Sequence, residues 1–119
     1  MSLIGIVQKG WESVGAGEFD TLVNDYVEEM VFIMPGQSNV LKGRSAFRTA
    51  LDNLGQILPP GFEITGLRHM QGGSEVISII NWKSNKVHDS QLTVLFKFTD
   101  EKITEERWFI DTNQWLSAF

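Results

Sequence analysis

Cysteine is absent from the sequence, proline occurs only three times, and no long apolar run is present. Without cysteine the chain can form no disulfide bond and has no thiolate chemistry. The opening residues, MSLIGIVQKGWESV, have neither the apolar core nor the small-residue cleavage site of a signal peptide, and no stretch is long enough to cross a bilayer. We therefore expect a cytoplasmic protein that has no contact with membranes.

Basic residues are also few. The chain has 10 Lys and Arg against 15 Asp and Glu, which gives a net charge of -5. A nucleic-acid-binding domain needs a basic face for the phosphates, so we expect no nucleic-acid partner. The 119 residues are 42% apolar, which suits one globular domain spanning residues 1–119 that buries roughly two-thirds of its unfolded surface.

His69 and His88 are the only histidines, and neither has a second ligand at metal-binding spacing. The sequence also lacks a phosphate-binding loop, a dinucleotide fingerprint and a nucleophile elbow. We therefore expect no metal and no cofactor. A structural or surface role is favoured for both histidines. His69 is a proton partner for Asp111 only if both point into one cavity.

The stretch LTVLFKFTDEKITEERWFID, residues 92–111, predicts two strands joined by a charged turn at residues 100–102. Apolar residues alternate with polar ones through residues 92–98, as in a strand with one buried face. In the returning strand, odd positions from 105 to 111 share one face and even positions from 104 to 110 share the other. A β-bulge would exchange these faces partway along the strand.

The rest of the chain predicts helices first and strands last. We expect helices at residues 2–15, 18–26 and 44–57, and strands at 30–34, 62–71 and 74–82. The segment Pro35 to Asn39 predicts a turn near a pocket mouth. This order predicts an α+β fold, in which three helices pack on a strongly curved, mostly antiparallel sheet that closes a cone with an internal pocket.

Three stretches carry a family resemblance: AGEFDTLVNDYVEEMVFIMPG, LKGRSAFRTAL and KFTDEKITEERWFIDTNQW. In this order and spacing they resemble the nuclear-transport-factor-like superfamily, in its SnoaL-like polyketide cyclase and ketosteroid isomerase branch. The resemblance covers nearly the whole chain, and it implies a cystatin-like cone with a small-molecule pocket. That superfamily contains both enzymes and plain binding domains, so the fold alone implies no activity.

The resemblance also implies a role for one residue. In SnoaL-like cyclases the general acid/base is an Asp at the position of Asp111, which implies cyclisation or isomerisation of an apolar carbonyl compound. The Tyr and the two Asp of ketosteroid isomerases correspond here to Gly10, Met34 and Val94. The isomerase triad is therefore absent. The arginine and second aspartate of limonene epoxide hydrolases have no match around residues 82–84.

Two interpretations of Asp111 remain open from the residues themselves. Asp111 is either a carboxylate inside an apolar cavity, whose pKa burial would raise, or a solvated cap that bonds the segment from Thr112. A pairing with Arg107 would favour a structural role. Three functions follow: a proton-transferring enzyme, a binding module without chemistry, and a dimerisation scaffold whose cone is filled by its own side chains.

The expected binding residues are mainly aromatic and apolar, and the expected ligand is a small apolar molecule. The predicted pocket residues are Trp11, Tyr26, Phe32, Met34, Phe47, Val94, Phe96, Arg107 and Phe109. Trp82 and Trp108 are expected on the outer face of the sheet, and the Glu105–Glu106 pair in solvent. An exposed face rich in Ile and Trp would be an apolar patch, so we expect a homodimer formed through the sheet.

Overall fold

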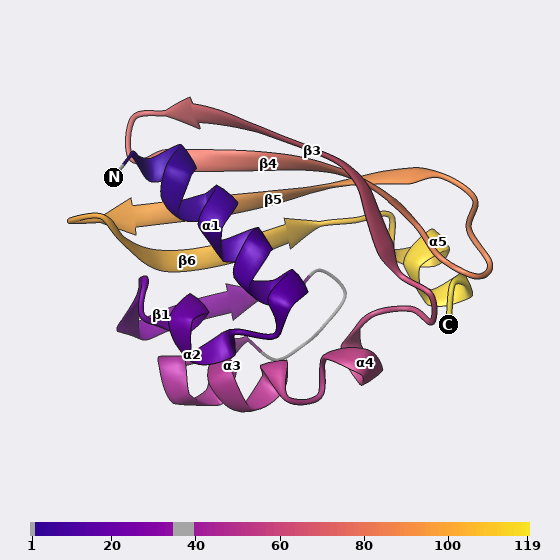
Figure 1. The fold of residues 1–119 in the computed structure, drawn as a ribbon, viewed down its shortest axis with the longest axis horizontal. Coiled ribbons are helices and arrows are strands. Elements are labelled where there is room, and N and C mark those ends of the chain that lie inside the picture. The colour runs from indigo at the N-terminus through magenta and orange to yellow at the C-terminus, as the bar shows by residue number, and fades with distance from the viewer. Residues whose placement is uncertain (1, 35–39) are drawn as a thin grey trace.

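A single six-stranded sheet, in the order β2-β1-β6-β5-β4-β3, curves around the helices (Figure 1). The computed structural model describes residues 2–34 and 40–119. The strands are β1 (Tyr26–Ile33), β2 (Leu41–Lys42), β3 (Glu63–Gly72), β4 (Glu75–Lys83), β5 (Ser90–Thr99) and β6 (Lys102–Phe109). The helices are α1 (Leu3–Ala16), α2 (Phe19–Val23), α3 (Arg44–Leu51), α4 (Leu54–Ile57) and α5 (Thr112–Ser117).

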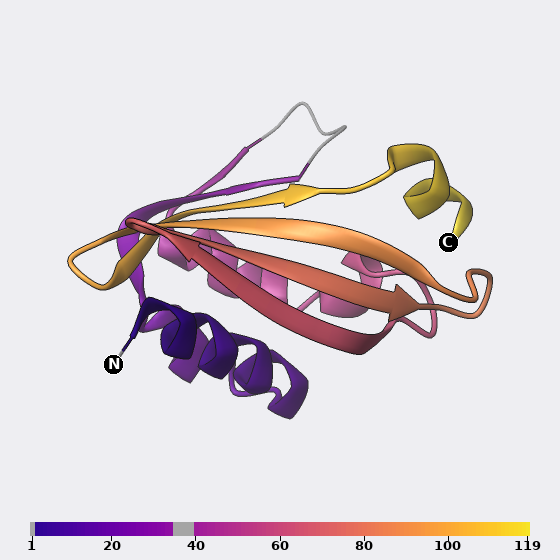
Figure 2. The same cartoon turned by 90° about the horizontal axis from the view of Figure 1, so that it is seen from above.

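The strands are antiparallel except where β1 runs parallel to β6. Helices α1 and α3 lie on the concave side of the sheet, and α5 lies at the end of the molecule opposite the N-terminus (Figure 2). The predicted α+β fold with a curved, mostly antiparallel sheet is therefore confirmed. No helix within the described ranges is long and apolar enough to cross a membrane.

Helix α1 begins and ends as the sequence predicts. The Ser2 side chain accepts a hydrogen bond from the backbone N–H of Gly5 at 3.0 Å, which satisfies one of the free donors of the first turn. Gly17 ends the helix at φ 72°, a left-handed conformation that glycine adopts without steric cost. The helix buries Ile6 and Val7 against the core.

Other boundaries differ from the prediction. The second helix ends at Val23, because Tyr26 already begins β1 and pairs with Ile103 of β6. The third predicted helix is divided into α3 and α4 at Asp52 and Asn53, residues whose side chains favour caps and turns over helix interiors. Strand β2 and helix α5 were not predicted. The predicted turn at residues 35–39 falls outside the described residues.

The β5–β6 hairpin has the predicted charged turn, built from Asp100 at φ 50° and Glu101 at φ 62°. Two consecutive left-handed residues suit the right-handed twist of the strands they join. Beyond the turn, Phe98 pairs with Ile103 but Lys97 pairs with Glu105, so Thr104 is an extra residue on β6. This bulge turns Ile103 to the same inner face as residues 106 and 108.

The core lies between the helices and the inner face of the sheet. Met30, Val76, Ile80 and Val94 are fully buried there. The expectation that Trp82 and Trp108 lie on the outer face is wrong, because they are only 2% and 6% exposed. Both sit at inward positions of their strands, and Trp82 stacks on Phe62. The large exposed apolar residues of the outer face are instead Met70, Ile77 and Phe109.

Candidate functional site

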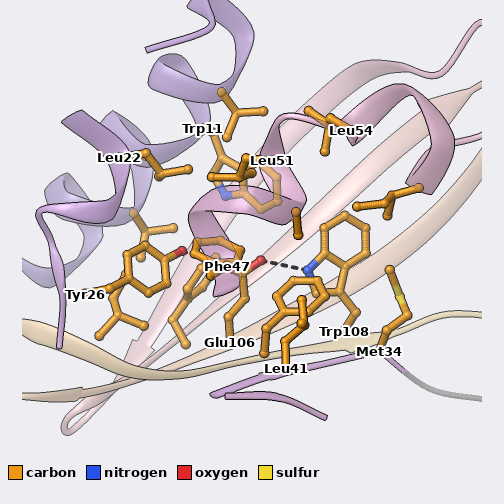
Figure 3. Close-up of a pocket in the computed structure, with 18 of the residues that line it drawn as sticks. Trp11, Leu22, Tyr26, Met34, Leu41, Phe47, Leu51, Leu54, Glu106 and Trp108 are labelled. Carbon is orange, nitrogen blue, oxygen red and sulfur yellow. Dashed lines mark hydrogen bonds between the residues drawn. The ribbon is translucent and has the colours of Figure 1, made fainter. Parts of the chain in front are cut away.

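A cavity of about 100 Å³ lies between α1, α3 and the concave face of the sheet (Figure 3). Helix α1 contributes Val7 and Trp11, and α3 contributes Phe47 and Leu51. The sheet contributes Phe32, Met34, Phe96 and Trp108, and α4 and its flanks add further aliphatic side chains. The wall is therefore almost entirely apolar, and a small number of polar groups determine its chemistry.

The most deeply buried acid in this wall is Glu106, on the inner face of β6. Glu106 is only 6% exposed, and its side chain lies between Tyr26 and Trp108. The indole Nε1 of Trp108 donates to Glu106 Oε2 at 2.8 Å, the dashed line in Figure 3. The Tyr26 hydroxyl donates to the other carboxylate oxygen. Both oxygens of the buried carboxylate therefore have a donor, as a charge inside an apolar wall requires.

The inward direction of Glu106 follows from its neighbours on the strand. Residues 106 and 108 share a face, and the large indole of Trp108 gains most by burial. The bulge at Thr104 lets Ile103 join them, and Thr104 Oγ1 bonds the carbonyl of Lys97 at 3.2 Å. The expectation that Glu106 is a solvated surface charge is therefore wrong. The signal in the sequence that could have placed Glu106 inside is Trp108, a large apolar side chain two residues along the strand on the same face.

Burial raises the pKa of the Glu106 carboxyl, while the hydrogen bonds from Trp108 and Tyr26 act in the opposite direction. Burial also raises the pKa of the Tyr26 hydroxyl, and the neighbouring Glu106 raises it further. Tyr26 therefore keeps its proton and acts as a donor. Glu106 is a carboxyl group whose proton affinity is increased, which is the property that a general base or acid needs.

A second acidic residue, Asp25, also lines the cavity. It differs from Glu106 because its side chain is 20% exposed and pairs with Lys9 Nζ at 3.3 Å. This partner holds Asp25 in a conventional ion pair. Within residues 2–34 and 40–119, no group of three or more His, Cys, Asp and Glu side chains converges to hold a metal ion.

Asp111 lies outside the cavity. It is exposed, it precedes α5 as the N-cap, and its Oδ1 accepts a hydrogen bond from the backbone N–H of Gln114 at 3.1 Å. Of the two interpretations left open for Asp111, the carboxylate inside the cavity is wrong and the cap of the following segment is confirmed. The physical reason is that the last strand ends at Phe109, so Asp111 serves the helix that follows.

The other predicted pocket residues divide between the two faces of the sheet. The cavity is lined by Trp11, Tyr26, Phe32, Met34, Phe47 and Phe96. Val94 is fully buried but does not reach the cavity. Arg107 and Phe109 lie on the outer face with the odd residues of β6, and Phe109 is 49% exposed. Arg107 Nε pairs with Glu105 Oε2 at 3.1 Å, so Arg107 does not hold Asp111.

Comparisons with known proteins agree with this geometry. The sequence profile of the SnoaL-like domain matches residues 7–106. A "putative polyketide cyclase" from Xanthomonas campestris has a similar fold, with 15% identity, a TM-score of 0.79 and coverage of 98% of this chain and 95% of that one.

Two further solved structures have the same fold. A "putative polyketide cyclase" from Pseudomonas putida has 13% identity, a TM-score of 0.82 and coverage of 99% and 98% of the two chains. Bal32a, from a soil-derived mobile gene cassette, has 21% identity, a TM-score of 0.82 and coverage of 98% and 95%. At these identities the likeness establishes the fold alone. No curated protein matches the sequence.

Proposed function

This chain belongs to the SnoaL-like domain family, and we propose that its cavity binds a compact apolar carbonyl compound to which Glu106 transfers protons. The observation that carries the proposal is a buried carboxylate in an otherwise apolar wall, held by Tyr26 and Trp108. Its raised pKa brings the carboxyl closer to the range in which it can both take and return a proton. Glu106 thus replaces Asp111 as the acid/base candidate.

The volume of the cavity supports a small ligand. About 100 Å³ is well below the roughly 300–1,000 Å³ of sites for drug-sized molecules. It is closer to the ~150 Å³ of an engineered cavity that binds benzene. A compound with one ring or a short chain therefore suits the cavity better than a polycyclic one.

The proton transfer needs no group beyond those of the wall. Glu106 takes a proton from the carbon next to the carbonyl, and the electrons of that C–H bond move to the carbonyl oxygen as an enolate. Return of the same proton to the same carbon regenerates the ligand. In D₂O the carboxyl first trades that proton for a deuteron, and delivery of the deuteron to the same carbon exchanges the α-proton. Return to a different carbon of a conjugated ligand isomerises it. Each carboxylate oxygen that accepts from Tyr26 or Trp108 keeps a second lone pair for the ligand.

Cyclohexanone in D₂O tests this proposal, with NMR following the loss of its α-proton signals. The wild-type protein should accelerate the exchange, and Glu106→Gln, which keeps the side-chain volume, should abolish it. Asp111→Asn is the matched control and should leave the rate unchanged, because Asp111 is exposed and caps α5. Exchange that survives in Glu106→Gln, or no exchange above the protein-free rate, would contradict the proposal.

A binding module without chemistry is the second candidate. The observation in its favour is that Tyr26 and Trp108 occupy both carboxylate oxygens, as a purely structural buried glutamate would require. Cyclohexanone that binds in the cavity, with no exchange in any variant, would support this candidate over the first. Its binding is followed by the chemical shifts of the indole N–H groups that line the cavity.

We also propose that two copies pair through the outer face of the sheet. Met70 and Ile77 are 52% and 37% exposed, and they form one cross-strand row with Leu95. Ile77→Lys places a charge in the middle of this row and should convert a dimer into a monomer in light scattering. Gln56→Lys, on the helical side, is the control. A wild-type monomer at high protein concentration would refute the pairing.

A further inference from the structure

A second polar network connects the protein surface to the cavity, and it does not include Glu106. Trp11 Nε1 on α1 lies 3.2 Å from Ser78 Oγ on β4. His69 Nδ1 on β3 lies 2.9 Å from the same oxygen, and His69 Nε2 lies 2.7 Å from Gln8 Oε1. The network therefore begins and ends on α1, at positions one helical turn apart, and crosses the two strands beneath it.

Only one arrangement of protons satisfies every atom in this network. The indole Nε1–H of Trp11 can only donate, so Ser78 Oγ accepts from it. Ser78 is fully buried, and the hydrogen bonds of the described residues offer its O–H no acceptor except His69 Nδ1. His69 Nδ1 therefore carries no proton, and Nε2 carries it and donates to Gln8. The network thus requires a neutral imidazole.

Trp11 is the member of the network that reaches the ligand space. Its ring lines the cavity and makes edge-to-face contacts with Phe96 at 6.1 Å and Trp108 at 6.2 Å between centroids. Trp108 in turn donates to Glu106. A rotation of the Trp11 indole would therefore alter both the shape of the cavity and the packing of Trp108, which holds Glu106.

Protonation of His69 removes the acceptor that Ser78 needs. Its Nδ1–H would then point at Ser78 Oγ, and the buried O–H of Ser78 would have no acceptor. Helix α1 carries two charged residues close to Gln8 in sequence: Lys9, which pairs with Asp25, and Glu12, one turn beyond Gln8. On β3, Arg68 alternates to the opposite face, and β4 flanks Ser78 with two apolar residues. Burial lowers the pKa of the His69 imidazole.

We propose that Ser78 and His69 are positioning residues, whose directed hydrogen bonds hold the Trp11 indole against the cavity and make ligand affinity depend on neutral His69. The affinity part rests on the proposed function, because it needs a ligand in the cavity. The positioning part does not, because the indole can be observed in the free protein.

The indole N–H signal of Trp11 in ¹⁵N NMR spectra tests the positioning, with Trp11→Phe providing the assignment. In the wild type this signal should shift as pH falls through the lowered pKa of His69. His69→Asn should remove that titration. Ser78→Ala should accelerate solvent exchange of the indole proton by on the order of tenfold, because a buried hydrogen bond is lost. His88→Asn is the matched control, since His88 is exposed and should leave the titration unchanged.

Cyclohexanone affinity, measured on the same samples, separates the positioning of Trp11 from its effect on ligand binding. The expected result is an affinity that falls by several-fold in His69→Asn, in Ser78→Ala and in the wild type at low pH, while Glu106→Gln retains the Trp11 titration. A Trp11 signal that titrates equally in the wild type and in His69→Asn overturns the positioning. Unchanged affinity in both variants overturns its link to the ligand. Failure of cyclohexanone to bind the wild type counts against the proposed function, and the indole titration then decides the positioning alone.

Discussion

The phenol of Tyr26 offers the sharpest test of how the buried acid is held. Tyr26→Phe removes the hydroxyl that donates to Glu106 and keeps the ring that packs on Phe47 at 5.0 Å between centroids. The carboxylate then retains only the donor from Trp108. A hydrogen bond to a charged group contributes about 1.5–3 kcal/mol to stability, so the free energy of unfolding should fall by roughly that amount while Glu106 is ionised.

Loss of the Tyr26 hydrogen bond should also change the proton affinity of Glu106. The Tyr26 hydrogen bond lowers the pKa of the Glu106 carboxyl, so losing this donor should raise that pKa further. Once Glu106 is protonated the lost bond is neutral, and the cost of Tyr26→Phe should fall to about 1 kcal/mol. The effect of this single hydroxyl should therefore depend on pH.

Urea unfolding of four proteins measures this dependence: the wild type, Tyr26→Phe, Glu106→Gln and the double variant. Measurements at a pH above the Glu106 pKa and at about pH 4 give the coupling free energy between the two residues. We expect a coupling of roughly 1 kcal/mol or more at the higher pH and less at the lower one. Additive effects at both pH values would refute the geometry in which Tyr26 stabilises the ionised carboxylate.

Three further predictions follow from single residues. Because the pKa of Glu106 is raised by folding, the folded chain binds more protons above the unfolded pKa of about 4.3, so stability should fall as pH rises towards the folded pKa. Glu106→Gln should remove this part of the fall in urea titrations, and an unchanged pH profile would contradict the raised pKa. Asp111→Ala should lower the free energy of unfolding by about 1 kcal/mol through loss of the α5 cap and leave cyclohexanone exchange intact; lost exchange would return Asp111 to the mechanism. Glu101→Gly should raise the free energy of unfolding by roughly 0.5–1 kcal/mol, because it relieves a left-handed residue, and a lower free energy of unfolding in the variant would contradict the turn geometry.

Most of the fold was predictable because its patterns are local. The alternation of Leu92 to Phe98 determines a strand with one buried face, and the same residues are buried at each even position. Ser2 and Gly17 mark the ends of α1 through their own backbone and side-chain preferences. The elements that were missed, β2 and α5, are short, and short elements depend on contacts with the rest of the molecule more than on propensity.

The site was only partly predictable because it depends on which face of one strand turns inward. The alternation along β6 was correctly predicted only for residues 105 to 109, where 106 and 108 share one face and 105, 107 and 109 share the other. The bulge takes Thr104 off the face of 106 and 108, and the strand ends before Asp111. The sequence left the choice of the buried face open, and the expectation favoured the face of Asp111. Packing instead buries the face of residues 106 and 108, so Trp108 lies in the core and Phe109 is exposed.

The amino-acid sequence by itself therefore determined a curved sheet over helices, an apolar cavity wall that includes Trp11 and Phe96, and the charged turn of the last hairpin. Only the tertiary structure decided that Glu106, and not Asp111, is the acid inside. The reason is that the bulge at Thr104 and the burial of Trp108 involve residues from several strands at once, so the alternation along one strand does not decide which of its two faces is buried.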